Sequence, residues 1–249
     1  MEFDLAMLLM LASVALLAGF FDAIAGGGGL ITLPALMLAG MDPVAAIATN
    51  KFQATAATVS ATITYSRKGM IDWRPGFPMA VMSMFGGAAG ALSISYLPRE
   101  WLQIAVPVLL LLVAAYFALS PTLHNREREP YISIIVFTVT LAPLIGFYDG
   151  VFGPGVGSFF MVAFVWVMGQ GILRAVSNSK LLNASCNLGA LAIFSVSGNI
   201  VLPVALCMAF AAFLGAQAGA RCATRFGPRL IKPLLIVICC SMAIKLLVG

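Results

Sequence analysis

The chain has 249 residues, of which 61% are hydrophobic and only 9% are charged, and its mean hydropathy is +1.04. A soluble domain carries roughly 25% charged residues, so this composition excludes a fully water-soluble domain and indicates a polytopic protein surrounded by the lipid bilayer. The net charge of +5 does not indicate a nucleic-acid partner, because the basic residues lie in short connectors between apolar runs.

The first half of the chain contains five hydrophobic segments, at residues 5–21, 30–40, 44–65, 77–97 and 101–120. Acidic residues at Glu2 and Asp4 replace the basic start of a signal peptide, so we expect the first segment to be a retained helix. The second segment would form roughly 16 Å of helix and cannot cross a hydrocarbon core of roughly 30 Å. It is either half of a broken span or one arm of a re-entrant hairpin.

A polar linker at 124–130 is followed by five further segments, at residues 132–148, 158–169, 172–196, 200–220 and 230–248. We therefore expect an all-α polytopic membrane protein with about eight full spans and two short, broken or re-entrant segments. The five cysteines lack the spacing of a metal site, and neither a metal nor a cofactor is predicted.

The two halves share landmarks at a constant spacing. Asp22 and Asp149 are 127 positions apart (149 − 22), and Lys51 and Lys180 are 129 apart (180 − 51). One register with a short insertion indicates an internal duplication. We predict a single transport domain over residues 1–249, with repeat one at 1–124 and repeat two at 125–249.

An odd number of crossings in each half would invert the second repeat relative to the first, and the basic residues test this orientation. With the connector at 67–74 in the cytoplasm, ten of the 14 Lys and Arg residues are cytoplasmic: Arg67, Lys68, Arg74, Arg126, Arg128, Arg174, Arg221, Arg225, Arg229 and Lys232. Arg99 and Lys245 lie outside or near the outer surface. The sequence therefore favours inverted-topology repeats with cytoplasmic basic loops and both termini external.

Glycine-rich breaks precede both short segments, at 26–29 and at 153–157. Inverted repeats with interrupted helices are typical of secondary transporters. Helices that begin near Leu30 and Ser158 would present free N–H groups and a positive dipole end, which suit an anion.

Lys51 and Lys180 lie about eight residues into their spans, where an inverted pair would approach the midplane from opposite sides. A charged side chain at the bilayer centre costs at least about 2.5 kcal/mol on insertion scales and indicates a functional site. The alternative is that each lysine reaches the interface or pairs with Asp22 or Asp149.

Polar residues follow each lysine at helical spacing. They are Thr55, Thr58 and Thr62 after Lys51, and Asn183 and Asn187 after Lys180. Two cations with hydroxyl and amide neighbours are typical of a site for a small oxyanion. The alternative for the threonine hydroxyls is that they only stabilise the packing of membrane helices. The pairs Gly86 with Gly90 and Gly215 with Gly219 indicate close helix packing.

Asp22 and Asp149 permit a rival interpretation, an intramembrane aspartyl protease with paired carboxylates. The Gly-x-Gly-Asp partner motif of such a protease does not occur in this sequence, and both aspartates stand at helix ends beside a glycine loop. That position favours capping, an ion pair with lysine, or proton coupling. A serine protease has less support, since the single histidine, His124, lies in the linker. A structural or receptor-like membrane protein would explain the hydrophobicity but not the lysines.

Several of these stretches together resemble the sulfite exporter TauE/SafE family of membrane permeases. They are the run 19–29 (GFFDAIAGGGG) with 33–36 (LPAL), 48–51 (ATNK), 68–73 (KGMIDW), 146–157 and 177–183 (SNSKLLN). The resemblance covers essentially the whole chain and implies export or uptake of sulfite, sulfoacetate or related organosulfonates across a bacterial-type inner membrane. Pro154 and Val156 interrupt the second glycine loop, so the two loops are not expected to contribute equally.

We therefore predict a secondary carrier, not an enzyme, that works by alternating access on a small anion; non-sulfur organic anions are the alternative substrates. The predicted binding residues are Lys51, Lys180, Asn50, Asn178, Thr55, Asn183, Gly26, Gly27, Gly28, Gly29, Gly153, Gly155 and Gly157, with Asp22 or Asp149 coupling protons. The direction of transport and the oligomeric state stay open, and a homodimer is compatible with the sequence.

Overall fold

The computed structural model describes residues 4–94, 96, 108 and 127–226, and all the regular structure in this part of the chain is helical. The predicted spans at 101–120 and 230–248, except for residue 108, lie outside the described residues. The helices are α1 (Leu5–Ala25), α2 (Gly29–Leu38), α3 (Pro43–Arg67), α4 (Trp73–Ile94), α6 (Ile134–Val139), α7 (Leu141–Val151), α8 (Val156–Trp166), α9 (Ile172–Ser197) and α10 (Leu202–Phe226).

Local sequence signals set where several helices begin. The Asp4 side chain accepts a hydrogen bond from the backbone N–H of Met7 and caps α1. Asp42 caps α3 in the same way through the N–H of Val44, and Pro43 takes the first helical position, where its missing N–H costs nothing.

The segment expected as one span at 132–148 is divided in two. The break lies at Thr140, between α6 and α7. Pro143 explains it, because a proline ring clashes with the carbonyl four residues earlier, here that of Val139, and supplies no N–H to the helix.

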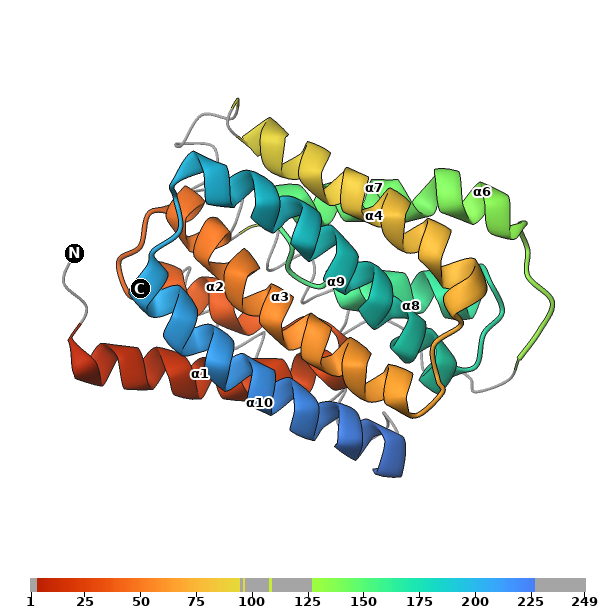
Figure 1. The fold of residues 1–249 in the computed structure, drawn as a ribbon, viewed down its shortest axis with the longest axis horizontal. Helices are drawn as coiled ribbons and strands as arrows, with labels where there is room; N and C mark the ends of the chain where they lie inside the picture. The colour runs from red at the N-terminus through yellow and green to blue at the C-terminus, as the bar shows by residue number, and fades with distance from the viewer. Residues whose placement is uncertain (1–3, 95, 97–107, 109–126, 227–249) are drawn as a thin grey trace.

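The two short helices reverse the chain. In Figure 1, α1 runs from the left of the view toward the middle of the molecule and α2 leads back to the left. α7 and α8 do the same from the right-hand side. Of the two sequence-based alternatives for the short segments, this arrangement matches the arm of a hairpin whose turn is the glycine loop.

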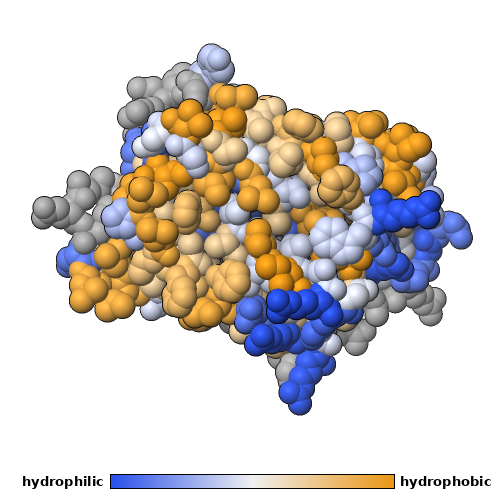
Figure 2. All heavy atoms as spheres, in the orientation of Figure 1, coloured by the Kyte–Doolittle hydropathy of each residue, from blue (hydrophilic) through white to orange (hydrophobic). Residues whose placement is uncertain are grey.

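The hydropathy of the long helices separates them into two kinds. Four stretches are long and apolar enough to cross a membrane: Leu5–Ala25, Trp73–Ile94, Ile134–Val151 and Leu202–Arg225. α3 and α9 have 25 and 26 residues, but they are more polar and carry the two lysines. Large apolar side chains are exposed on the outer helices, and Figure 2 shows a mostly hydrophobic face with hydrophilic residues gathered toward the lower right. The architecture is that of a multi-pass membrane protein.

Contacts between the halves occur in matching pairs. A Cβ added to Gly215 of α10 would lie 2.0 Å from the carbonyl oxygen of Leu16 in α1, and one added to Gly86 of α4 would lie 2.2 Å from that of Pro143 in α7. These four residues stand at the spacings of the duplication (215 − 86 = 129 and 143 − 16 = 127). The next pairs, Gly219 with Phe20 and Gly90 with Phe147, repeat the pattern at 2.1 Å each, so the expectation of close helix packing at these glycines is confirmed.

Corresponding helices also run in opposite directions. In Figure 1, α3 runs from left to right and α9 from right to left, while α4 runs from right to left and α10 from left to right. The ends of α3 and α10 and the starts of α4 and α9 therefore lie toward one end of the molecule, and they carry Arg67, Arg225, Arg74 and Arg174.

Candidate functional site

Both lysines lie inside the bundle. Lys51 and Lys180 are each the ninth residue of their helix, counted from Pro43 in α3 and Ile172 in α9. The side chains are buried, with exposed fractions of 1% and 0%. Neither lysine is exposed at the surface of the protein, so each ammonium group depends on partners in the interior to stabilise its charge.

Each lysine pairs with the aspartate of the other half. The Nζ of Lys51 lies 2.6 Å from Oδ1 of Asp149, and the Nζ of Lys180 lies 2.9 Å from Oδ2 of Asp22. Pairing with an aspartate was one of the sequence-based alternatives for these lysines. The two pairs give the site two positive and two negative charges.

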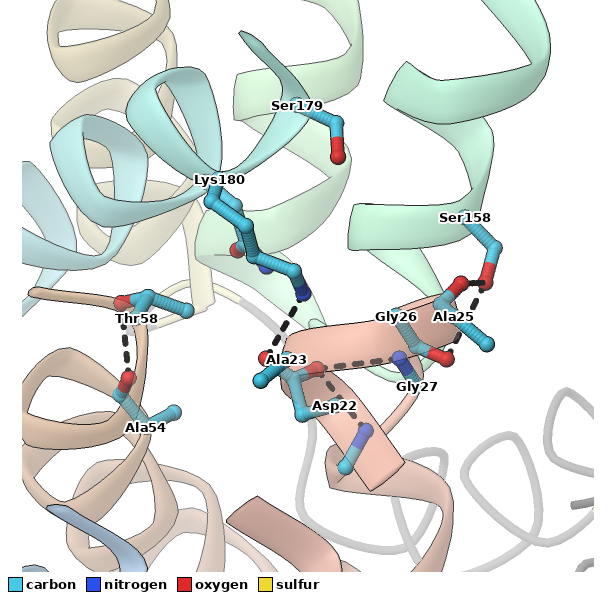
Figure 3. A network of polar contacts seen from close by, with 12 residues as sticks. Asp22, Ala23, Ala25, Gly26, Gly27, Ala54, Thr58, Ser158, Ser179 and Lys180 are labelled. Atoms are coloured by element: carbon cyan, nitrogen blue, oxygen red, sulfur yellow. Dashed lines mark hydrogen bonds and ion pairs between the residues drawn. The ribbon is translucent and has the colours of Figure 1, made fainter. Parts of the chain in front are cut away.

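Asp22 holds the first glycine loop as well as Lys180. Its Oδ1 accepts hydrogen bonds from the backbone N–H groups of Gly27 and Gly28, each at 3.0 Å, while Oδ2 binds the lysine (Figure 3). Both carboxylate oxygens are thus satisfied. Two of the loop amides expected to face an anion are occupied by this side chain in the structure.

Asp149 has fewer partners. Oδ1 binds Lys51, but Oδ2 is buried and has no hydrogen-bond partner among the described residues. At the spacing of the duplication, Gly27 corresponds to position 154 (27 + 127), which is a proline without an N–H. The expectation that the two loops contribute unequally agrees with this difference.

The two glycine loops lie against each other between the pairs. The Ser158 hydroxyl donates to the carbonyl oxygens of Ala25 and Gly26, at 2.5 and 3.1 Å (Figure 3). A Cβ on Gly26 would lie 2.3 Å from the backbone nitrogen of Ser158. Gly26 has a φ of +77°, a conformation that other residues rarely adopt, so glycine is required there on both grounds.

Two glycines of the second loop leave room for the lysine head groups. A Cβ on Gly153 would lie 2.6 Å from the Nζ of Lys51, and one on Gly157 would lie 3.0 Å from the Nζ of Lys180. These glycines let the backbone approach the ammonium groups closely.

A small cavity lies beside the ion pairs. Ten residues expected at the site line it: Asp22, Gly27, Gly29, Asn50, Lys51, Asp149, Gly153, Gly155, Gly157 and Asn183. Four others, absent from the predicted set of binding residues, complete the lining: Ala54, Thr58, Val156 and Asn187. The volume open to the centre of a water-sized sphere is about 20 Å³, and one water needs roughly 10–15 Å³ by this measure. This conformation has room for a water or two.

Asn50 is held in the cavity wall by two residues that the sequence did not single out. The Oδ1 of Asn50 accepts from Thr32 Oγ1 at 2.5 Å and from Gln53 Nε2 at 2.9 Å. Its amide nitrogen lies 3.6 Å from where a Cβ on Gly29 would be. The polar pair Asn50 and Gln53, three apart in one helix, is the signal that could have indicated this cluster.

Other predicted residues lie away from the cavity wall. Thr55 donates to the carbonyl oxygen of Lys51 within α3. Lys180, Gly26 and Gly28 are neighbours of lining residues rather than lining residues themselves. Asn178 belongs to a separate cluster, where its Oδ1 accepts from the N–H of Asp72 and its amide donates to Gln170.

An ion pair joins the two halves near Asn178. Arg174 donates twice to Asp72, through Nε at 2.7 Å and Nη2 at 2.6 Å. These hydrogen bonds, with the one from Asn178, hold the pKa of the Asp72 carboxyl below its ordinary value, although partial burial acts against them. At the corresponding positions of the other half there is one neutral bond, from the N–H of Val201 to Thr49.

Comparisons with known proteins agree with this architecture. Residues 11–246 match the profile of the family described as sulfite exporter TauE/SafE. The chain belongs to the sulfite exporter TauE/SafE family. No solved structure matches the chain significantly.

Several proteins similar to this chain are named as transporters. The chain is 45% identical over 241 residues to a probable membrane transporter protein, ORF9, of Sinorhizobium sp, covering 97% of this chain and 92% of the relative. It is 39% identical over 234 residues to the probable membrane transporter protein YfcA of Escherichia coli, covering 94% and 87%. A probable membrane transporter protein of Haemophilus influenzae is 35% identical over 246 residues, covering 99% and 96%. The chain is thus a member of a membrane transporter family.

Proposed function

We propose that this protein is a secondary transporter of small anions, with sulfite or an organosulfonate as substrate, and that Lys51 and Lys180 bind the anion. The observation that carries the proposal is the pair of buried ammonium groups, each held by an aspartate of the other half beside a polar cavity. The family description supplies the sulfur oxyanion.

Each aspartate binds its lysine at the ammonium group where the substrate anion would bind. A carboxylate is itself an oxyanion that accepts hydrogen bonds from an ammonium group. Because the cavity holds only a water or two, an entering anion must separate its walls and replace a carboxylate at one lysine or both. Asn50, Thr58 and Asn183 line the same cavity and supply further polar groups.

Alternating access follows from two inverted repeats, at 1–124 and 125–249, that rock against each other. The opposite directions of α3 and α9, and the matching contacts of α1 with α10 and of α7 with α4, support such a relationship. The turns at the glycine loops would act as hinges. The arginines near the shared ends of α3, α4, α9 and α10 favour a cytoplasmic position for that end in the inner membrane, with external termini.

Proton coupling fits the charge balance of the site. Two lysines and two aspartates sum to zero, and a bound monovalent anion would leave one uncompensated negative charge in a buried site. Such a charge is costly. A proton on Asp22 or Asp149 would restore neutrality, so anion and proton would move together.

The alternative of an aspartyl protease has less support from the geometry. A protease of this kind needs two carboxylates that share one proton, whereas Asp22 and Asp149 each bind a lysine. No feature of the cavity distinguishes sulfur oxyanions from carboxylates, so non-sulfur organic anions stay the second substrate class.

The test is counterflow in liposomes that contain the purified protein and are preloaded with unlabelled sulfite, sulfoacetate, thiosulfate or acetate. We expect the sulfur oxyanions to accelerate uptake of radiolabelled sulfite, and acetate to have little effect. Acceleration by acetate alone would contradict the substrate class. Uptake equal to that of protein-free liposomes under every preload would contradict the transport function.

A further inference from the structure

The proposed function leaves open which aspartate carries the proton. The structure distinguishes them. With Lys180 withdrawn, Asp22 would keep its two hydrogen bonds from the backbone N–H groups of Gly27 and Gly28. Two such bonds stabilise an ionised carboxylate. Asp22 can therefore stay negative while its lysine binds an anion.

Asp149 has no such support. Its Oδ1 pairs with Lys51, and its Oδ2 has no hydrogen-bond partner within the described part of the chain. The Cys186 thiol also lies beside this carboxylate, but a thiol is a weak donor. Once Lys51 turned to an anion, Asp149 would be a buried carboxylate without a counter-ion, which a bound proton neutralises.

The cavity that Asp149 lines also contains an unpaired acceptor for that proton. Asn187 is 2% exposed, and its Oδ1 is the other buried side-chain oxygen with no hydrogen-bond partner among the described residues. The Nδ2 of Asn187 donates to the backbone oxygen and to Oδ1 of Asn183, which fixes the side chain so that Oδ1 cannot exchange places with Nδ2. Asp149 and Asn187 line the same cavity.

We propose that Asp149 is the proton carrier of this transporter, that its proton resides on Oδ2, and that Asn187 accepts the resulting hydrogen bond directly or through one water. The proton comes from water on one side of the membrane, binds as Lys51 turns to the anion, and leaves to water on the other side when the Lys51–Asp149 pair forms again. This inference rests on the proposed function. It specifies one proton for each monovalent anion.

The charged and titratable groups around Asp149 come from several elements. Lys51 faces it from α3 and Cys186 from α9. Asp22, in α1, carries a charge of the same sign and repels it. Tyr148, its neighbour in α7, donates its hydroxyl proton to the carbonyl oxygen of Pro154 and so holds the loop. Among these groups, Asp149 is the acidic residue with an oxygen, Oδ2, that accepts no hydrogen bond from any described residue.

The test combines infrared difference spectroscopy with proton uptake in liposomes, using sulfite as the probe. Adding sulfite to the wild type should produce the carbonyl band of a protonated carboxylic acid and acidify the liposome interior. Asp149→Asn should lose the band and the acidification, and its sulfite exchange should become independent of pH. Asp22→Asn should keep the band.

Two further variants, with one control, keep the test decisive if Asp22→Asn fails to fold. Pro154→Gly supplies the missing N–H, which favours ionised Asp149, so half-maximal uptake should move about one pH unit lower. Pro78→Gly, at an exposed position of α4, should leave the pH profile unchanged. Asn187→Leu removes the acceptor and should weaken or shift the band.

The outcomes separate this inference from the proposed function. A band that persists in Asp149→Asn, or a Pro154→Gly profile identical to the wild type, would overturn the assignment of Asp149 while sulfite exchange itself stood. If wild-type liposomes neither exchange sulfite nor show any sulfite-induced spectral change, the proposed function and the inference that rests on it both fall.

Discussion

The Nζ of Lys51 lies 2.6 Å from Oδ1 of Asp149, a residue 98 positions later in the chain (149 − 51) and in the other half. Lys180 and Asp22 form the reciprocal pair. Each half therefore neutralises the buried charge of the other, and the site exists only where the halves meet. Separating the halves would break or exchange both pairs, and in the proposed mechanism this links substrate binding to the relative position of the halves.

The first prediction concerns the stability of the Lys51–Asp149 pair. Lys51→Met should destabilise the protein by about 3–5 kcal/mol at pH 7, because Asp149 loses its counter-ion and must either remain a lone buried charge or take up a proton. Lys51→Met combined with Asp149→Asn should recover most of that loss. Thermal unfolding in detergent, followed by size-exclusion chromatography, measures both. A single variant as stable as the wild type would show that the pair does not form.

The second prediction concerns the close approach of α4 and α7. Gly90→Val places side-chain atoms where a Cβ alone would lie 2.1 Å from the carbonyl oxygen of Phe147. The helices must move apart, at a cost of about 1–3 kcal/mol or more. Ala89→Val, on the exposed neighbouring position of α4, is the matched control. Equal melting temperatures for the two variants would contradict the packing.

The third prediction concerns pH and the Asp72–Arg174 ion pair. The pKa of Asp72 is lower in the folded protein than its ordinary value, mainly through its hydrogen bonds with Arg174. The pair therefore stabilises the fold above the ordinary pKa of aspartate, about 3.9, and this contribution disappears as the pH falls through the folded-state pKa. Asp72→Asn should remove that part of the pH dependence.

A double-mutant cycle with Asp72→Asn and Arg174→Gln measures the same pair at pH 7. Because both side chains are partly exposed, we expect a coupling energy of about 0.2–1 kcal/mol. A coupling energy that is absent at pH 7 and appears at pH 3 would contradict the predicted pH dependence of this ion pair.

The fourth prediction concerns the orientation of Asn50. Thr32→Val removes the hydroxyl that donates to Asn50 Oδ1 and keeps the side-chain shape. Because the amide then loses one of its two anchors, we expect weaker sulfite binding, by roughly fivefold to tenfold for one hydrogen bond of about 1 kcal/mol. Thr62→Val, whose hydroxyl bonds within α3, is the control. Equal apparent affinity in both variants would contradict the role of Thr32.

Sequence reasoning reached much of this arrangement through composition and spacing. The apolar segments marked α1, α3, α4, α9 and α10 within a few residues, and the length of the short segments showed that they could not span alone. The lysines stood out because a charged side chain within an apolar segment is energetically costly and therefore indicates a functional site. Their pairing with the aspartates was among the alternatives stated.

The rest depends on three-dimensional relationships that spacing does not encode. The sequence could not choose between each lysine's own aspartate and that of the other half, because the choice depends on how the halves dock. The break at Thr140 was missed, although Pro143 in an apolar run was a visible signal. Thr32 and Gln53 were missed because hydroxyls and amides in membrane helices commonly serve packing alone.

The most direct test of the central claim is sulfite counterflow by paired variants that keep the site uncharged. Lys51→Met with Asp149→Asn, and Lys180→Met with Asp22→Asn, each remove one ion pair without leaving a buried charge. We expect both proteins to insert and remain monodisperse, and sulfite exchange to fall to the level of protein-free liposomes. Exchange at the wild-type rate by either variant would show that the lysines do not bind the transported anion.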